Sequence, residues 1–290
     1  MLSKRSLPLS VLFCMCFSLF LRAADSKATR ANLTAAQIVE KNVAARGGLQ
    51  AWRAVQAMSW AGKMDGGGGS INRSRRIAEG RRGRAGNMEL VDNKDGKMKG
   101  EADKQVQLPF VLEMKRPTKS RVEIQFAGKT AVQVYDGTNG WKVRPYLNRN
   151  DVEPFTEEEA KSEAGRAYLD GPLVDYAAKG TKIELEAVEP VEGRDAYKLK
   201  LRTKDGDEQH VWIDKQSFLD VRVEGAPRRM DGRMRTVWVY QRDFRPVQGL
   251  MVPFVLETAV DGYQNTHKMI FEKIEVNPKL DDALFAKPKV

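Results

Sequence analysis

The chain of 290 residues is poor in the residue types that most often carry metal and redox chemistry, with two cysteines and two histidines. Cys14 and Cys16 lie in an apolar run near the N-terminus, and the rest of the chain has no thiol. This distribution excludes disulfides, a cysteine nucleophile and a zinc–thiolate site from the rest of the chain. His210 and His267 are too few for a three-histidine metal site. We therefore expect no metal and no cofactor.

The chain also lacks the short motifs that mark common enzyme classes. It has no GxSxG, HExxH, Walker or GxGxxG sequence, and its GGGGS stretch has no phosphate-binding lysine. The carboxylates alternate outward on predicted strands or lie in predicted turns, so no acid/base pair can be picked out. We expect no catalytic residue and no enzymatic activity. A carboxylate-only hydrolase leaves little trace in a sequence and stays open as an alternative.

Residues 1–23 have the parts of a secretory signal peptide. Two basic residues precede an apolar run over 7–21, and small residues follow at Ala23 and Ala24, where we expect cleavage. The run is shorter than the roughly 20 residues that a membrane-spanning helix needs. Removal of the signal lowers the formal charge from +10 to +7. A basic exported protein is drawn to anionic lipid or polysaccharide rather than to nucleic acid.

The remaining sequence begins with a helix and continues mainly as strands. In NLTAAQIVEKNVAARGG, Thr34 and Gln37 form a capping box and two glycines end the helix. From residue 57 onward the apolar period changes from about 3.6 to 2, as in RVEIQF and YKLKLR. Runs of this kind recur about a dozen times and are separated by short Gly-containing turns such as FAGKTA. So many antiparallel strands in one domain require a barrel or a deeply curved sheet.

Two segments interrupt the strands. Residues 156–179 begin with a second capping box, Thr156 with Glu159, and we expect short helices there that cover part of the sheet. Residues 66–105 form a basic, Gly-rich insertion between the first strands, with six arginines in the span Arg73–Arg84. The export signal and the lack of stacking aromatics in this insertion argue against nucleic-acid binding. A solvated loop and a contact with an anionic membrane surface both stay open.

Apolar residues at alternate positions define one predicted dry face of the sheet. If the alternation is read consistently, this face is larger than the short helices can cover, which leaves room for an apolar ligand. The residues that we predict to line this cavity are Met114, Val122, Ile124, Phe126, Val132, Val134, Trp141, Val143, Leu199, Leu201 and Phe254. The residues that we predict in the covering lid are Ile38, Val39, Val43, Leu169 and Tyr176. A fully packed core is the alternative interpretation.

Several stretches, taken in order, resemble the outer-membrane lipoprotein-sorting protein family, which belongs to the group of the carrier LolA and its acceptor LolB. They are IVEKNVAARGGLQAWRAVQAMSWAGKM, MKRPTKSRVEI, VQVYDGTNGWKVRPY, DGPLVDYAAKG, VEGRDAYKLKL, VWIDKQSFLDVR, GLMVPF and IEVNPKLDDALF. The resemblance implies a mainly β (α+β) fold, an open, strongly curved antiparallel half-barrel of about 11 strands with a short helical lid.

The resemblance also implies a function. It predicts a single domain over 24–290 in the periplasm, a monomer that holds lipid or lipoprotein acyl chains as a carrier or sensor in outer-membrane lipoprotein sorting. Such a protein binds its ligand by apolar contact, without catalysis. The insertion at 66–105 is longer and more basic than we expect for that family. A non-catalytic envelope interaction module with a packed core is the alternative function.

Overall fold

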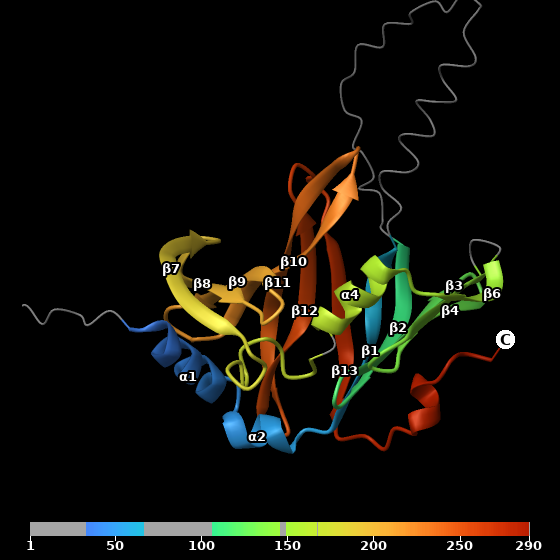
Figure 1. Ribbon diagram of the computed structural model, residues 1–290, viewed down its shortest axis with the longest axis horizontal. Helices are drawn as coiled ribbons and strands as arrows, with labels where there is room; N and C mark the ends of the chain where they lie inside the picture. Colours follow the sequence, from blue (N-terminus) through green and yellow to red (C-terminus); the bar gives the residue numbers. More distant parts are fainter. Residues whose placement is uncertain (1–32, 67–105, 146–148, 167, 290) are drawn as a thin grey trace, which may run out of the picture. The chain divides into compact units, whose positions relative to one another are not determined.

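A computed structural model describes residues 33–66, 106–145, 149–166 and 168–289 of the chain (Figure 1). Leu33–Val290 form one compact unit. The predicted signal peptide and the arginines of the insertion lie outside the described residues, and the single domain over 24–290 stays a prediction. None of the helices in the described ranges is both long and apolar enough to cross a membrane.

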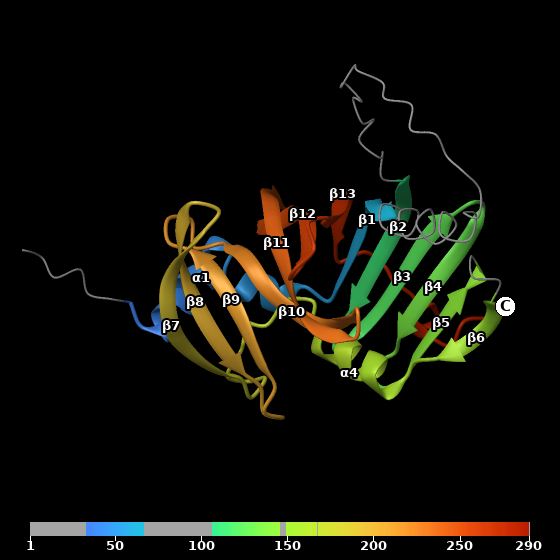
Figure 2. The same ribbon diagram turned by 90° about the horizontal axis from the view of Figure 1, so that it is seen from above.

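The described residues form one antiparallel sheet in the order β6-β5-β4-β3-β2-β1-β13-β12-β11-β10-β9-β8-β7. Strands pair with their sequence neighbours, except that β1 pairs with β13 and that β6 and β7 are the two edges. Figure 2 shows the sheet as a bent layer. The strands are β1 (Ala57–Gly66), β2 (Val106–Lys115), β3 (Lys119–Phe126), β4 (Lys129–Tyr135), β5 (Gly140–Arg144), β6 (Arg149–Pro154), β7 (Lys182–Val191), β8 (Arg194–Arg202), β9 (Glu208–Asp214), β10 (Asp220–Met230), β11 (Arg233–Val247), β12 (Leu250–Val260) and β13 (His267–Val276).

The predicted open, strongly curved antiparallel fold is confirmed, with 13 strands in place of about 11. The periodic runs in the sequence account for all but β6. Its sequence, RNDVEP, has no apolar alternation, because β6 is an edge strand whose residues are exposed or half-buried. The segment that contains the insertion connects β1 and β2, which pair directly with each other.

Both predicted capping boxes are present. In α1 (Ala35–Ala45), the Gln37 backbone N–H donates to Thr34 Oγ1 at 3.2 Å, and the Thr34 N–H donates to Gln37 Oε1 at 2.9 Å. Thr156 and Glu159 form the same pair of bonds at the start of α4 (Glu157–Arg166). A short helix α2 (Leu49–Ala54) follows α1.

The second half of the predicted helical segment is a series of turns. Residues 169–180 contain no helix, and Gly171, Asp175 and Gly180 adopt positive φ angles of 77°, 51° and 75°. Residues in this region of φ/ψ space cannot continue a right-handed helix. We call residues 168–180 the covering turns.

The main core lies on the face of the sheet against which α1, α2 and the covering turns pack, and we call this face the inner face. Ile38 of α1, Trp52 of α2 and Leu173 of the covering turns are buried there with Phe110 and Leu199 of the sheet. A smaller cluster of Val191, Ala196 and Trp212 lies on the opposite, outer face.

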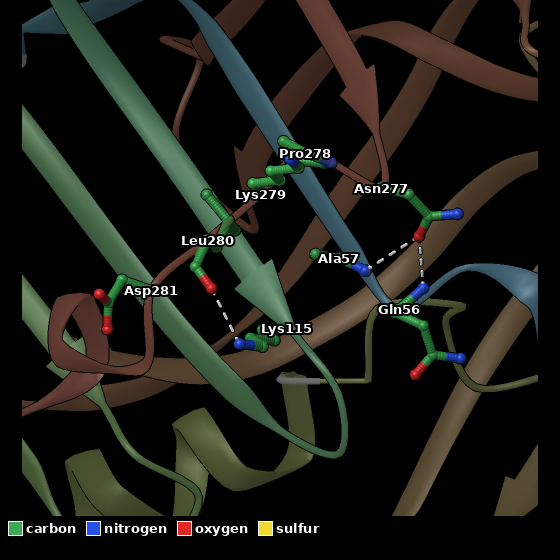
Figure 3. Close-up of a pocket in the computed structure, with 8 residues that line it drawn as sticks. All are labelled: Gln56, Ala57, Lys115, Asn277, Pro278, Lys279, Leu280 and Asp281. Atoms are coloured by element: carbon green, nitrogen blue, oxygen red, sulfur yellow. Dashed lines mark hydrogen bonds between the residues drawn. The ribbon is translucent and has the colours of Figure 1, made fainter.

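The C-terminal segment leaves the sheet at Asn277 and is tied to β1 by hydrogen bonds (Figure 3). Asn277 Oδ1 accepts from the backbone N–H groups of Gln56, at 2.6 Å, and Ala57, at 3.3 Å. Lys115 Nζ donates to the Leu280 carbonyl at 2.9 Å. A hollow of about 590 Å³ lies between these residues, and the residues that line it are the ones that hold the C-terminal segment in place. The segment continues to the short helix η2 (Asp282–Phe285).

Candidate functional site

Apolar side chains form three cross-strand rows on the inner face of the central strands. Directly opposed residues of an antiparallel pair share one face of the sheet, so the rows follow from the pairing register. The first row joins Leu108, Met64, Met269 and Leu256, the second Ile124, Phe110, Gly62 and Phe271, and the third Val122, Leu112, Trp60 and Ile274.

The rows differ in how deeply they are buried. Phe110 and Phe271 in the second row are 2% and 5% exposed, and their rings meet edge to face at 5.8 Å. Every side chain of the first row is only half-buried, including Met64 and Met269. The covering helices therefore leave partly uncovered apolar surface near the end of β1 that leads into the insertion.

Gly62 permits the backbones of β1 and β13 to approach each other closely in the second row. A Cβ atom at this position would lie 2.0 Å from the backbone oxygen of Ile270 on β13. The pairing of β1 with β13 shifts between Ala61 and Gly62, which brings the two backbones together there. Only glycine fits this close approach.

Six of the predicted cavity residues lie on the inner face. Met114, Ile124, Leu199, Leu201 and Phe254 belong to the main core or pack against it, and Val122 shares their face because it opposes Leu112. All five predicted lid residues, Ile38, Val39, Val43, Leu169 and Tyr176, pack in the same cluster. Their roles in binding a ligand and in opening stay predictions.

The predicted placement of Val132, Val134, Trp141 and Val143 on the inner face is wrong. Val132 opposes Glu123 and Val134 opposes Arg121, whereas the inner-face residues of β3 are Val122 and Ile124. Trp141 and Val143 then oppose Val134 and Val132 and share their outer face.

A two-residue turn causes this change of face. Ala127 and Gly128, with φ angles of 48° and 74°, join Phe126 to its partner Lys129. A hairpin of this kind pairs residues whose numbers sum to an odd value, so apolar residues at even positions before and after it lie on opposite faces. Phe126, the last predicted wall residue, follows the inner-face parity but is 43% exposed at the strand end.

Of the four apolar outer-face residues of β4 and β5, Val134 and Val143 are buried, and Val132 and Trp141 are half-buried. Arg121 Nη1 donates to the Leu284 carbonyl of η2 at 3.0 Å, which places η2 over the outer face of β3. Val134 and Phe285 are each 1% exposed. The turn before Trp141 is an ordinary hairpin loop, as expected, because Asp136 Oδ1 accepts from the Thr138 and Asn139 N–H groups at 2.7 and 2.6 Å.

The inner face of β4 and β5 is polar and is covered by α4. Lys142 Nζ lies 2.5 Å from Glu159 Oε1, and the Lys142 side chain is 8% exposed. Ser120 Oγ donates to Glu163 Oε1 at 2.6 Å. Burial acts to raise the pKa of Glu159, but the hydrogen bonds from Lys142 and from the Thr156 N–H outweigh it and lower the pKa.

Helix α4 also reaches the other end of the sheet. Lys161 Nζ lies 3.0 Å from Asp207 Oδ1 in the turn between β8 and β9. A cavity of about 420 Å³ lies between α4, the covering turns and this turn, and its lining includes Tyr135, Tyr168 and Leu201. The helix thus spans the open side of the curved sheet.

A buried acid fixes the covering turns. Asp170 is 1% exposed, and its two oxygens accept from Lys179 Nζ at 2.6 Å and Arg116 Nη2 at 2.7 Å. Burial lowers the pKa of Lys179, although the Asp170 carboxylate acts in the opposite direction. Arg116 also donates to the carbonyls of Val55 and Trp52. The network therefore joins the covering turns, α2 and the β2–β3 turn.

A second buried acid fixes α1. Asn42 Nδ2 donates to Asp220 Oδ1 at 2.9 Å and to the Phe218 carbonyl at 2.8 Å. Arg46 Nη1 lies 3.7 Å from Asp220 Oδ2 and donates to the Asp170 carbonyl at 3.2 Å. Burial raises the pKa of Asp220, against the opposing effects of Arg46 and Asn42. Neither acid was predicted from the sequence, because Arg116 is 54 residues from Asp170 and Asn42 is 178 residues from Asp220.

The described residues contain no group of three or more His, Cys, Asp or Glu side chains that could hold a metal ion. The inner face thus presents apolar surface to a ligand. The polar networks around Asp170 and Asp220 hold the covering turns and α1 in place over part of it.

Three solved structures are similar over most of the chain. A LolA superfamily protein from Nitrosomonas europaea is 14% identical with a TM-score of 0.53, and the match covers 88% of this chain and 98% of that one. A putative outer membrane lipoprotein-sorting protein domain from Vibrio parahaemolyticus is 11% identical with a TM-score of 0.50, covering 87% and 96%. The fold is LolA-like.

A DUF1329 family protein from Desulfovibrio piger is also similar, with 13% identity, a TM-score of 0.50 and coverage of 86% of this chain and 95% of that one. No protein-family model matches the sequence, and no curated protein does. At these identities the likeness establishes the fold, and the resemblance seen in the sequence is confirmed at that level.

Proposed function

We propose that this protein is a periplasmic carrier or sensor that holds the acyl chains of a lipid or lipoprotein against its inner face, in outer-membrane lipoprotein sorting. The half-buried apolar row of Leu108, Met64, Met269 and Leu256 carries the proposal. A half-buried apolar surface inside an open sheet is suited to a ligand without directional hydrogen bonds.

The affinity would come from the hydrophobic effect, without catalysis. Each acyl CH₂ that leaves water contributes about 0.8 kcal/mol. The rows run across β12, β13, β1, β2 and β3, so an extended chain could contact several strands. The export signal read from the sequence and the LolA-like fold support an envelope location.

The experiment that tests this proposal is lipid analysis of the purified protein. We expect native mass spectrometry and organic extraction to detect bound lipid, and the delipidated protein to bind the fluorescent fatty acid cis-parinaric acid. A protein that carries no lipid and takes up no cis-parinaric acid contradicts the proposal.

The second candidate is a non-catalytic envelope interaction module with a packed core. The depth of burial around α1 and α2 favours it, since Ile38 is 0% and Trp52 2% exposed. The same fatty-acid titration separates the two functions, because a filled core leaves no room for an acyl chain.

A further inference from the structure

The hairpin of β10 and β11 extends beyond its neighbours. Strand β12 pairs with β11 only from Val237 onward, and β9 pairs with β10 only between Asp220 and Val223. Residues 226–235 therefore form a two-stranded arm that pairs with no further strand among the described residues, and Figure 1 shows it projecting from the sheet. We call this segment the arm. A two-stranded hairpin alone is marginally stable in water.

The arm is strongly basic. It carries Arg228, Arg229, Arg233 and Arg235 and a single acid, Asp231, which accepts a hydrogen bond from the Tyr263 hydroxyl. None of the four arginines forms an ion pair with a carboxylate in the described parts of the chain, and the first three are exposed.

Arginines elsewhere on the sheet have acidic partners. Arg202 of β8 forms an ion pair with Glu208 at 2.5 Å, and Arg222 of β10 forms one with Glu189 at 2.9 Å. Among the residues that the structure describes, the arginines of the arm therefore lack such acidic partners, and their positive charge is complementary to an anionic surface.

The arm also exposes apolar side chains beside its arginines. Met234 is 49% exposed and opposes Arg229, and the half-buried Met230 opposes Arg233. Flexible methionines suit the boundary between head groups and acyl chains, while long arginine side chains keep their charge at the head groups.

The arm lies at the same end of the sheet as the half-buried first row. Strand β1 ends and β13 begins at this end, so Met64 and Met269 of the half-buried row are located there. Arg235 and Arg233 lie on the same face as the buried Val237, which opposes Val260.

We propose that the arm docks the protein onto a bilayer surface that contains anionic lipids. The arginines bind the head groups, and Met234 and Met230 enter the interface. Docking in this orientation turns the uncovered end of the inner face toward the lipid. The proposal goes beyond acyl-chain binding and does not require it.

The test is co-sedimentation of the full mature chain with phosphatidylcholine vesicles, with and without phosphatidylglycerol. Wild-type protein should bind only the anionic vesicles, and less at high salt. The variant Arg228→Gln/Arg229→Gln/Arg233→Gln should bind about 100-fold more weakly, because each arginine near such a surface contributes about fivefold. Met234→Ala should weaken binding by about threefold.

A matched control removes the same charge elsewhere. Lys279→Gln/Lys287→Gln/Lys289→Gln changes three exposed lysines in the C-terminal segment, which leaves the sheet at the opposite end of β1. This control should bind within about threefold of wild type. Binding of cis-parinaric acid without vesicles should be unchanged in both triple variants, so the result is independent of acyl-chain binding.

The proposal is overturned if the arm variant binds anionic vesicles as tightly as the wild-type protein. It is also overturned if the arm and control variants lose the same affinity for these vesicles. Deletion of residues 67–104 should leave the effect of the arm substitutions intact. If that deletion abolishes binding while the arm variant binds normally, the insertion is the docking surface and the arm is not.

Discussion

The β8–β9 end and the β4–β5 end of the sheet both bury apolar side chains, but on opposite faces. At the β8–β9 end, Leu199 and Leu201 face inward and are 0% and 1% exposed beneath the helices. At the β4–β5 end, the inward position is occupied by Lys142, and Val134 is 1% exposed on the outer face. The first end contributes to the main core on the inner face, and the second has its buried valine on the outer face.

This difference shows what apolar alternation predicts and what it leaves open. Alternation indicates that one face of a strand is dry, but it does not indicate whether that face is the inner or the outer one. The turn between two strands decides this, because its length sets which residues oppose each other.

The largest expected effect is at Asp170, which holds the covering turns to the rest of the molecule. Asp170→Ala should lower the free energy of unfolding by about 4 kcal/mol, because it leaves Lys179 and Arg116 as partly buried charges without their acid. Urea denaturation measures this loss.

The loss at Asp170 should depend on pH. Burial already lowers the pKa of Lys179, and without the acid the pKa falls further. A group whose pKa is lower in the folded state makes stability fall as pH falls. The deficit of Asp170→Ala should therefore be smaller at about pH 10 than at about pH 7. A deficit that is constant over this range would contradict the role of Lys179.

The next prediction compares the two buried ends directly. Leu199→Ala should cost about 3 kcal/mol of stability and Val134→Ala about 2 kcal/mol, because both side chains are fully buried. Only Leu199→Ala changes the inner face, so Val134→Ala should bind cis-parinaric acid like wild type. If a folded Val134→Ala variant binds fatty acid more weakly than wild type, the assignment of Val134 to the outer face is contradicted.

The smallest expected effect is at the polar end. Lys142→Met should change the free energy of unfolding by less than about 1 kcal/mol, because Glu159 is 42% exposed and water can replace the lost partner. Thermal unfolding of the variant measures the change. A loss comparable to that at Leu199 would contradict this weak contribution of the ion pair between Lys142 and Glu159.

Much of the fold could be predicted because its signals are local. The capping boxes at Thr34 and Thr156, the alternating strands and the hairpin at Asp136 each depend on residues close in the sequence. The signal for the change of face was present as well, in the two-residue turn Ala127–Gly128, whose effect on parity follows from hairpin geometry.

The remaining features depend on contacts between distant residues. The bond from Asn42 to Asp220 joins positions that are 178 apart, and Arg116 and Asp170 are 54 apart. No local pattern indicates such pairs, since a buried charge requires its partner to be placed by the whole fold. The hydrogen bond from Arg121 to the Leu284 carbonyl of η2 likewise joins positions that are 163 apart.

Met269 and Ile270 offer the most direct test that the inner face binds acyl chains. They are neighbours on β13, with Met269 half-buried on the inner face and Ile270 42% exposed on the outer face. Met269→Glu should weaken cis-parinaric acid binding at least about tenfold, because a carboxylate is poorly accommodated beside an acyl chain. Ile270→Glu should leave the affinity unchanged. A folded Met269→Glu variant with wild-type affinity would contradict the assignment of the inner face as the ligand site.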